Sequence, residues 1–263
     1  MKVKLMADIT VGDIKKITKG KLLCGNEYDI CENFCIDSRE IKSGDVFVGI
    51  KGERVNGNEL YEEVLKKGAK CLILENVEIP EDIIKKFTDS AIIIVEDTIK
   101  ALQQIAEYKR NLYKIPVIAI TGSVGKTSTK DIVAEVVSKK YKVLKTQGNL
   151  NNHIGLPLTI LSLKDEEAMV VELGMSHLGE ISTLTKIAKP TIAIITNVGT
   201  AHIGNLGSRE NILKAKMEII EGLQNNGTLI INNDNDMLRT VKYDNLITIS
   251  IINNRVFISI LHL

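Results

Sequence analysis

The sequence contains no tryptophan, and only 4% of its residues are aromatic. We therefore expect an aliphatic core, and we do not expect a surface on which nucleic-acid bases stack against aromatic rings. Neither sign of charge is in excess, because 34 Lys and Arg residues stand against 33 Asp and Glu residues. Proteins that coat nucleic acid or lie on an anionic membrane carry a basic excess, so neither partner is expected here.

Long apolar runs are also missing. The longest stretch without a charged residue, 190–208, contains Asn, Gly and His residues that would leave polar groups stranded in hydrocarbon. Residues 1–6 include two lysines and lack the apolar segment that a secretory signal peptide requires. We therefore expect a cytoplasmic protein with neither a leader nor a membrane-spanning helix, and we expect a monomer.

Cysteines are few and lie close to the N-terminus: Cys24, Cys31, Cys35 and Cys71. They form no CxxC pair, and the first histidine is His153, so the ligand spacing of a zinc site is missing. Reduced, partly buried thiols are the expectation.

The length of 263 residues corresponds to about two domains. A helical stripe at 99–106 stops before Pro116, which predicts a boundary between domains at 1–113 and 114–263. Upstream, apolar runs at 46–50, 71–74 and 91–95 alternate with helical patterns such as 61–67, which predicts a small α/β domain. Downstream, strands are expected at 117–121, 142–145, 168–173, 191–197 and 228–232, with helices at 127–140, 155–163, 179–188 and 208–223. This rhythm predicts a doubly wound, mainly parallel sheet of the P-loop type, with ligands at the carboxyl ends of its strands.

A phosphate-binding loop is expected directly after the first strand of the second domain. Its residues are Thr121, Gly122, Ser123, Val124, Gly125, Lys126 and Thr127, followed by Ser128. Glycines let backbone N–H groups curl around phosphate oxygens, the lysine supplies a positive charge, and the threonine offers a hydroxyl to Mg²⁺. ATP and Mg²⁺ are therefore the expected ligands, and the alternative is a glycine-rich turn without a ligand. The helix that follows is expected to bury Ile132, Val133, Val136 and Val137.

The loop reads TGxxGKT, a shorter form than GxxxxGKT, and it resembles that of the Mur ligases and folylpolyglutamate synthases. Further segments agree with this resemblance: 35–39 with 44–48 and 52–54, 146–157, 172–177 and 197–202. Together they resemble the Mur ligase family over roughly residues 1–250. Within the family, the resemblance is to the type that joins D-alanyl-D-alanine to UDP-N-acetylmuramoyl-tripeptide.

The resemblance implies a reaction and a set of site residues. The implied reaction is ATP-dependent amide-bond formation through an acyl phosphate, with the two compounds named above as small-molecule substrates. Lys126, His202 and Lys216 would be catalytic, and Thr127, Glu172, His202 and Lys216 would lie around metal ions, Lys216 as a carbamate. Asn232 and Asp234 would contact adenine and ribose, Asn149 and Asn152 the muramoyl-peptide, and Ser38 and Arg39 the uridine-diphosphate end.

The residues themselves leave alternatives open. Glu172 ends an apolar strand where a carboxylate suits Mg²⁺, although a solvated strand-end Glu has the same pattern. His202 could be a hydrogen-bonded structural residue, and Asn232-Asn233-Asp234 is also an ordinary turn sequence. Lys216 falls on an apolar helical stripe, where a lysine is either buried at a cost or directed along the surface to solvent.

Some positions depart from the family pattern, namely Val124, His153, Thr200 and Asn56-Gly57. None of them is an expected metal or phosphate ligand. The family's third, C-terminal domain is also absent from this sequence, and residues 256–263 resemble nothing expected there. We therefore expect little ligase activity from this chain alone. The alternatives are a catalytically silent ATP- or UDP-sugar-binding fragment, or another amide ligase such as a tripeptide-forming or folylpolyglutamate type.

Overall fold

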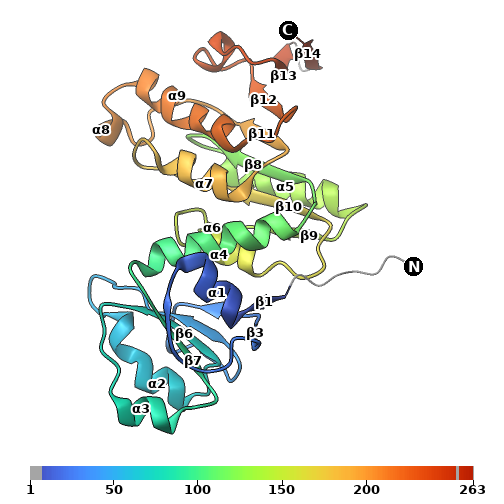
Figure 1. Ribbon diagram of the computed structural model, residues 1–263. Coiled ribbons are helices and arrows are strands. Elements are labelled where there is room, and N and C mark those ends of the chain that lie inside the picture. Colours follow the sequence, from blue (N-terminus) through green and yellow to red (C-terminus); the bar gives the residue numbers. More distant parts are fainter. Residues whose placement is uncertain (1–7, 253–254, 263) are drawn as a thin grey trace. The chain divides into compact units, whose positions relative to one another are not determined.

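The computed structural model describes residues 8–252 and 255–262; residues 1–7, where no leader is expected, lie outside this range. The chain forms two compact units (Figure 1). Unit 1 ends at Tyr113 and also includes Ile160–Lys164, whereas unit 2 comprises Lys114–Thr159 and Asp165–Leu263. No helix in the described ranges is long and apolar enough to cross a membrane.

Unit 1 is a small α/β fold. Its elements are β1 (Ile9–Thr10), α1 (Val11–Thr18), β2 (Lys21–Cys24), β3 (Ile30–Cys31), β4 (Phe34–Cys35), β5 (Val46–Val48), η1 (Gly57–Leu60), α2 (Tyr61–Lys66), β6 (Cys71–Glu75), α3 (Glu81–Lys86), β7 (Ala91–Val95) and α4 (Thr98–Leu112). Five strands form a sheet in the order β2-β7-β6-β5-β4, and β1 pairs with β3 separately. Only the β2–β7 pair of the larger sheet is antiparallel.

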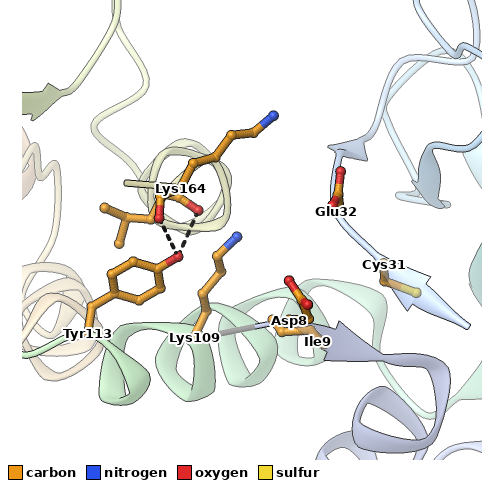
Figure 2. Close-up of a pocket in the computed structure, with 8 residues that line it drawn as sticks. Asp8, Ile9, Cys31, Glu32, Lys109, Tyr113 and Lys164 are labelled. Atoms are coloured by element: carbon orange, nitrogen blue, oxygen red, sulfur yellow. Dashed lines mark hydrogen bonds between the residues drawn. The ribbon is translucent and has the colours of Figure 1, made fainter. Parts of the chain in front are cut away.

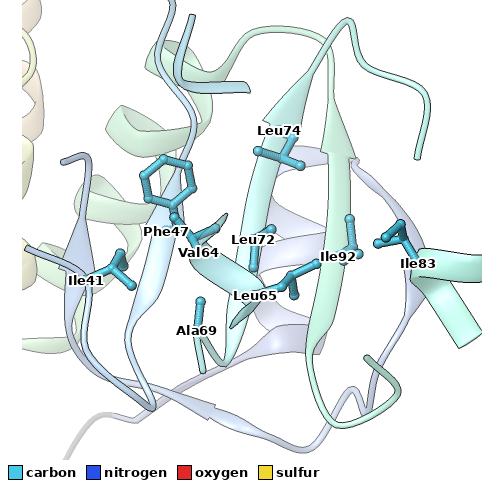
Figure 3. Close-up of a cluster of buried hydrophobic side chains, with 9 residues drawn as sticks. All are labelled: Ile41, Phe47, Val64, Leu65, Ala69, Leu72, Leu74, Ile83 and Ile92. Carbon is cyan, nitrogen blue, oxygen red and sulfur yellow. The ribbon is translucent and has the colours of Figure 1, made fainter. Parts of the chain in front are cut away.

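The core of unit 1 is aliphatic except for Phe47, in keeping with the scarcity of aromatic residues. Figure 3 shows its central cluster, which consists of Ile41, Phe47, Val64, Leu65, Ala69, Leu72, Leu74, Ile83 and Ile92. Strands β6 and β7 are buried almost throughout, which explains why their sequences are continuous apolar runs. All four cysteines are free thiols, two of them buried and two half-buried.

The segment Ile160–Lys164 is attached to α4 by hydrogen bonds to its backbone carbonyl groups. The Lys109 ammonium donates to the Leu161 carbonyl oxygen at 2.7 Å, and the Tyr113 hydroxyl donates to the carbonyl oxygens of Leu163 and Lys164 at 3.3 and 3.0 Å. Figure 2 shows this region, where a cavity of about 80 Å³ is lined by Asp8, Ile9, Cys31, Glu32, Lys109, Tyr113, Leu163 and Lys164. Unit 1 is therefore completed by a segment that lies well beyond Tyr113 in the sequence.

Unit 2 is built around one larger sheet. Its elements are β8 (Val117–Thr121), α5 (Lys126–Ser138), β9 (Val143–Lys145), α6 (Gly155–Leu161, whose end belongs to unit 1), β10 (Ala168–Glu172), α7 (Glu180–Ala188), β11 (Ile192–Ile195), α8 (Ile203–Leu206), α9 (Arg209–Met217), η2 (Glu218–Gly222), β12 (Thr228–Asn232), η3 (Leu238–Thr240), β13 (Asn245–Ile252) and β14 (Arg255–His262). The strand order is β14-β13-β12-β11-β8-β10-β9. Only the β13–β14 pair is antiparallel.

The order of strands reverses at β8. From β8 the chain passes to β9 and β10 on one side and then to β11 on the other. Glu172 lies opposite Ile120, and Ile195 lies opposite Thr121, so three strands end at the same edge. This is the topological switch point, where doubly wound sheets bind their ligands. The structure confirms the predicted mainly parallel, doubly wound sheet.

Three parts of unit 2 differ from the sequence-based prediction. The helix expected at 208–223 is α9 followed by the 3₁₀ helix η2, and it begins after Ser208, whose hydroxyl accepts a hydrogen bond from the Asn211 N–H at 3.2 Å. The sheet also continues beyond the last predicted strand, through β13 and β14. Strand β11 is shorter than the predicted range 191–197.

The predicted buried face of α5 is wrong at two of its four positions. Ile132 and Val136 are 66% and 65% exposed, and the other two positions are half-buried. Lys130 and Ala134 are buried instead. They share a face with Thr127, because residues three and four apart lie together on a helix. At the start of this face, the Thr127 hydroxyl donates to Glu172 at the end of β10.

Candidate nucleotide-binding site

The predicted phosphate loop lies between β8 and α5, at the edge where the sheet order reverses. Gly125 precedes the helix with a φ of +80°, in the left-handed region that glycine adopts readily. Within the described part of the chain, no side chain caps the first turn of α5. The backbone N–H groups of that turn and the positive end of the helix dipole are therefore available to an anion.

The first half of the loop is held by residues that follow β11. The Asn197 side-chain oxygen accepts the N–H groups of both Ser123 and Val124 at 3.0 Å. The Thr196 hydroxyl donates to the Val124 carbonyl at 2.7 Å, and the Gly199 N–H donates to the Ser123 hydroxyl at 2.9 Å. The N–H groups of Ser123 and Val124 were expected to bind phosphate. In the structure they donate to the Asn197 side chain instead. Neither Asn197 nor Gly199 was predicted to hold the loop.

Replacing Gly122 by alanine should destabilise the protein by about 1–2 kcal/mol and distort the loop. The φ of Gly122 is +154°, and a Cβ atom there would lie 1.8 Å from the Thr196 hydroxyl oxygen. Urea unfolding measures the loss. Gly204→Ala is the matched control, because its Cβ would meet no atom within 4 Å. Equal stability of the two variants would contradict the close packing of the loop.

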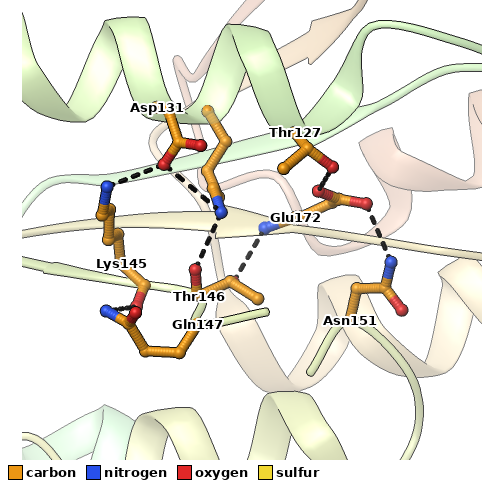
Figure 4. A network of polar contacts seen from close by, with 8 residues as sticks. Thr127, Asp131, Lys145, Thr146, Gln147, Asn151 and Glu172 are labelled. Carbon is orange, nitrogen blue, oxygen red and sulfur yellow. Dashed lines mark hydrogen bonds and ion pairs between the residues drawn. The ribbon is translucent and has the colours of Figure 1, made fainter. Parts of the chain in front are cut away.

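Thr127 and Glu172 come together as the sequence predicts for an Mg²⁺ site. The Thr127 hydroxyl donates to Glu172 Oε2 at 2.8 Å, and Asn151 Nδ2 donates to Oε1 at 2.8 Å (Figure 4). The Glu172 N–H donates to the Thr146 hydroxyl at 3.0 Å. Glu172 is only 3% exposed, so the alternative of a solvated strand-end carboxylate is wrong. Asn151 was missed, although its neighbours Asn149 and Asn152 were selected.

The two selected asparagines have different surroundings. Asn149 is exposed. The side-chain oxygen of Asn152 accepts the N–H groups of Ile154 and Gly155 at 3.1 and 2.8 Å, so it caps the start of α6. Asn152 therefore has a structural contact that is not apparent from the sequence.

Two lysines lie close to the loop. The Lys126 ammonium donates to the Gly122 carbonyl at 2.9 Å. Lys216, on α9, is 1% exposed, so its side chain does not extend along the surface to solvent. Burial, and secondly the charge of Lys126, lower the pKa of Lys216 to about 8. The Thr121 hydroxyl at the end of β8 is buried without a hydrogen-bond partner among the described residues.

In the described part of the structure, no hydrogen bond connects His202 to these residues. It precedes α8 with a φ of +64°, in the left-handed region, and its side chain is exposed. Such a backbone conformation is uncommon for a residue other than glycine. His202 is therefore placed on an exposed turn after β11.

The segment after β12 is a hydrogen-bonded turn. The Asn232 side-chain oxygen accepts the Asp234 N–H at 3.0 Å, and the Asp234 carboxylate accepts the Ile251 N–H at 2.8 Å. The next acidic residue, Asp236, receives two hydrogen bonds from the Arg209 guanidinium, at 2.6 and 2.7 Å. Arg209 also donates to the Val198 carbonyl at 2.8 Å, which links this turn to the loop after β11.

Ser38 and Arg39 lie in unit 1. Ser38 is buried, and its carbonyl accepts a hydrogen bond from the Lys67 ammonium at 2.7 Å. The exposed Arg39 guanidinium forms a two-point ion pair with Asp37, at 2.9 and 2.5 Å. Hydrogen bonds from Arg39 lower the pKa of Asp37 to about 2.

The oxygen atoms at the switch point suit Mg²⁺. Across the described residues, no group of three or more His, Cys, Asp or Glu side chains could hold a metal ion. Mg²⁺ needs no such cage, since it commonly takes one or two protein oxygens and completes its octahedron with phosphates and waters. The Thr127 hydroxyl and the Glu172 carboxylate, 2.8 Å apart, fit that requirement.

Comparisons with known proteins show the family of this chain. Residues 32–110 match the Mur ligase family catalytic domain, and residues 120–258 match the Mur ligase middle domain. The UDP-N-acetylmuramoyl-tripeptide–D-alanyl-D-alanine ligase of Bacillus subtilis is 40% identical over 88% of this chain and 50% of its own length. The Escherichia coli enzyme of that name is 36% identical over 88% of this chain and 49% of its own length. The chain thus spans about half the length of these curated relatives.

Solved structures with similar folds include MurF from Acinetobacter baumannii, with a TM-score of 0.80 and 30% identity over 98% of this chain and 58% of the other. MurF ligase from Thermotoga maritima in complex with ADP has a TM-score of 0.76 and 33% identity over 88% of this chain and 58% of the other. The match to the middle domain alone extends over more than half of the sequence. The chain belongs to the Mur ligase family.

Proposed function

We propose that this chain forms the nucleotide-binding and UDP-sugar-binding part of an ATP-dependent amide ligase. Its substrates would be UDP-N-acetylmuramoyl-tripeptide and D-alanyl-D-alanine, the compounds named for its relatives. The observation that most strongly supports this function is the contact between Thr127 and Glu172 beside the uncapped N-terminus of α5. Together these groups offer N–H donors to phosphate and hard oxygens to Mg²⁺.

The loop and helix would bind the triphosphate. The N–H groups at the start of α5 would donate to phosphate oxygens, and Lys126 would exchange its hydrogen bond with the Gly122 carbonyl for one with phosphate. Thr127 and Glu172 would hold Mg²⁺. When bound, Mg²⁺ would neutralise negative charge on the phosphates, which is a main source of catalysis in phosphoryl transfer.

The reaction would proceed by two substitutions. An oxygen of the substrate's terminal carboxylate forms a bond to the γ-phosphorus, and the bond from that phosphorus to the β–γ bridging oxygen breaks, releasing ADP. The amine of D-alanyl-D-alanine then attacks the acyl carbon, loses a proton, and inorganic phosphate leaves. In the first step, Lys126 would remain with the phosphates as negative charge moves toward ADP.

The remaining assignments extend the proposal to other residues. Lys216 as a carbamate, together with His202, would hold a second metal ion, and the burial of Lys216 supports this role. Asn232 and Asp234 would contact adenine and ribose. Asn149 and Asn152 would contact the muramoyl-peptide, and Ser38 and Arg39 the uridine diphosphate.

Titration calorimetry tests the proposed function. The chain should bind ADP, more tightly with Mg²⁺ than with EDTA, and it should bind UDP-N-acetylmuramoyl-tripeptide but not a folate polyglutamate. Failure to bind nucleotide would overturn the proposal for the loop and helix. Binding of nucleotide and folate without the UDP-sugar would instead assign the chain to the folylpolyglutamate type.

A further inference from the structure

Lys130 is a buried cation that has no part in the function proposed above. It lies on α5, four residues after Lys126, and it is 3% exposed. Its ammonium donates to the Thr146 carbonyl oxygen at 2.9 Å. Burying a charged group is unfavourable unless hydrogen bonds and an opposite charge compensate for lost water. A neutral side chain of similar size would avoid this cost.

The compensating charge belongs to Asp131. One oxygen of its carboxylate lies 3.5 Å from the Lys130 ammonium and 2.7 Å from that of Lys145. The hydrogen bond from Lys145, ahead of the other contributions, lowers the pKa of Asp131. The carboxylate is therefore ionised at neutral pH and supplies a negative charge near the Lys130 ammonium. A hydrogen bond from an ammonium to a carbonyl, such as that from Lys130 to Thr146, is stronger than one between neutral groups.

Thr146 connects Lys130 to Glu172, the predicted metal ligand. It is fully buried, and its hydroxyl accepts the Glu172 N–H at 3.0 Å. The Glu172 carboxylate accepts the Thr127 hydroxyl at 2.8 Å. Thr127 and Lys130 are three residues apart on α5 and so share a face. The hydrogen bonds close a ring that runs from α5 through Thr146 and Glu172 and back to α5 (Figure 4).

We propose that Lys130 is a positioning residue for Glu172. It fixes Thr146 against α5, Thr146 fixes the main chain of Glu172, and the carboxylate is thereby aimed at the Thr127 hydroxyl. Residues behind a metal ligand often set metal affinity in this way. The inference rests on the proposed function, since it takes Thr127 and Glu172 as the residues that hold Mg²⁺.

The test measures ADP binding by calorimetry with Mg²⁺ and with EDTA, well below the unfolding temperature of each variant. Lys130→Met keeps most of the side-chain volume but loses the donor. It should reduce the gain in ADP affinity caused by Mg²⁺ by about tenfold and leave the affinity in EDTA nearly unchanged. Thr146→Val removes only the hydroxyl that accepts the Glu172 N–H, and it should show the same selective loss.

Lys109→Met is the matched control. Lys109 is also buried, at 7% exposed, and also donates to a backbone carbonyl, but it lies in unit 1. This variant should be less stable and keep the full Mg²⁺-dependent gain. If the wild-type chain shows no such gain, the proposed function fails. If the wild type shows it and Lys130→Met retains it, the positioning role of Lys130 is wrong, whatever the result for Thr146→Val.

Discussion

Replacing Lys126 by alanine should lower the affinity for ATP ten- to hundredfold. Hydrogen bonds to charged groups contribute roughly 1.5–3 kcal/mol, and the variant removes one such donor from the phosphates. The only hydrogen bond lost from the described structure is that to the Gly122 carbonyl, so the fold should survive. Calorimetry of Mg²⁺-ATP binding measures the loss.

Lys139→Ala is the control for this experiment. Lys139 lies just beyond the other end of α5 and forms an exposed ion pair with Glu135. Its replacement removes the same charge from the chain but not from the loop. ATP affinity should then stay close to that of the wild type. A folded Lys126→Ala protein that binds ATP as tightly as the wild type would rule out the phosphate-binding loop.

Replacing Lys216 by methionine should stabilise the protein at pH 7 by up to about 3 kcal/mol. Burial, then the charge of Lys126, lower the pKa of Lys216 from 10.5 to about 8. At neutral pH the folded state must hold an unfavourable buried ammonium. No carboxylate in the described ranges pairs with it. A methionine of similar length removes that charge and keeps the packing of α9.

The pH dependence provides a second readout. Between about pH 8 and pH 10.5, the unfolded state keeps a proton that the folded state releases from Lys216. The free energy of unfolding therefore rises as the pH increases from about 8 to about 10.5. This gain is fully present above pH 10.5 and is lost as the pH falls through 8. Urea unfolding in CO₂-free buffer should show this rise in the wild type and not in Lys216→Met.

Lys214→Met separates this effect from a general loss of charge. Lys214 lies on the same helix but is exposed, so its replacement should change stability by less than about 0.5 kcal/mol. A Lys216→Met protein that is less stable than the wild type at pH 7 would contradict the unfavourable burial. A stabilised variant that still bound the proposed second metal ion would contradict the role proposed for Lys216.

The buried strands were the most predictable part of the fold. The ranges predicted for β7, β8 and β12 coincide with the observed strands. Strands covered on both faces are continuous apolar runs, which stand out against amphipathic helices. β13 and β14 were missed because β14 is the edge strand of the sheet and β13 lies next to it. Ile251, Val256 and Ile258 are more than 60% exposed there, so apolar residues do not mark a buried strand.

The site was predictable where a residue's chemistry is visible in its own sequence neighbourhood. Thr127 follows a glycine-lysine pair, and Glu172 ends a strand, so each carries its own signal. Asn151 and Asn197 lie in family-like segments, but their contacts could not be predicted, because their partners lie 21 and 73–74 positions away in the sequence. Lys130 was hidden for another reason. The buried face of α5 was predicted from apolar residues alone, so Lys130 was not expected to lie on it.

The late completion of unit 1 has a consequence for synthesis on the ribosome. Lys109 and Tyr113 reach hydrogen-bond partners that lie 50–52 positions further along the chain. When Tyr113 leaves the ribosome, those partners have not been translated. Unit 1 can make its last native contacts only after the phosphate loop and α5 have emerged. A gene cut after Tyr113 would encode unit 1 without the carbonyl groups that receive these two side chains.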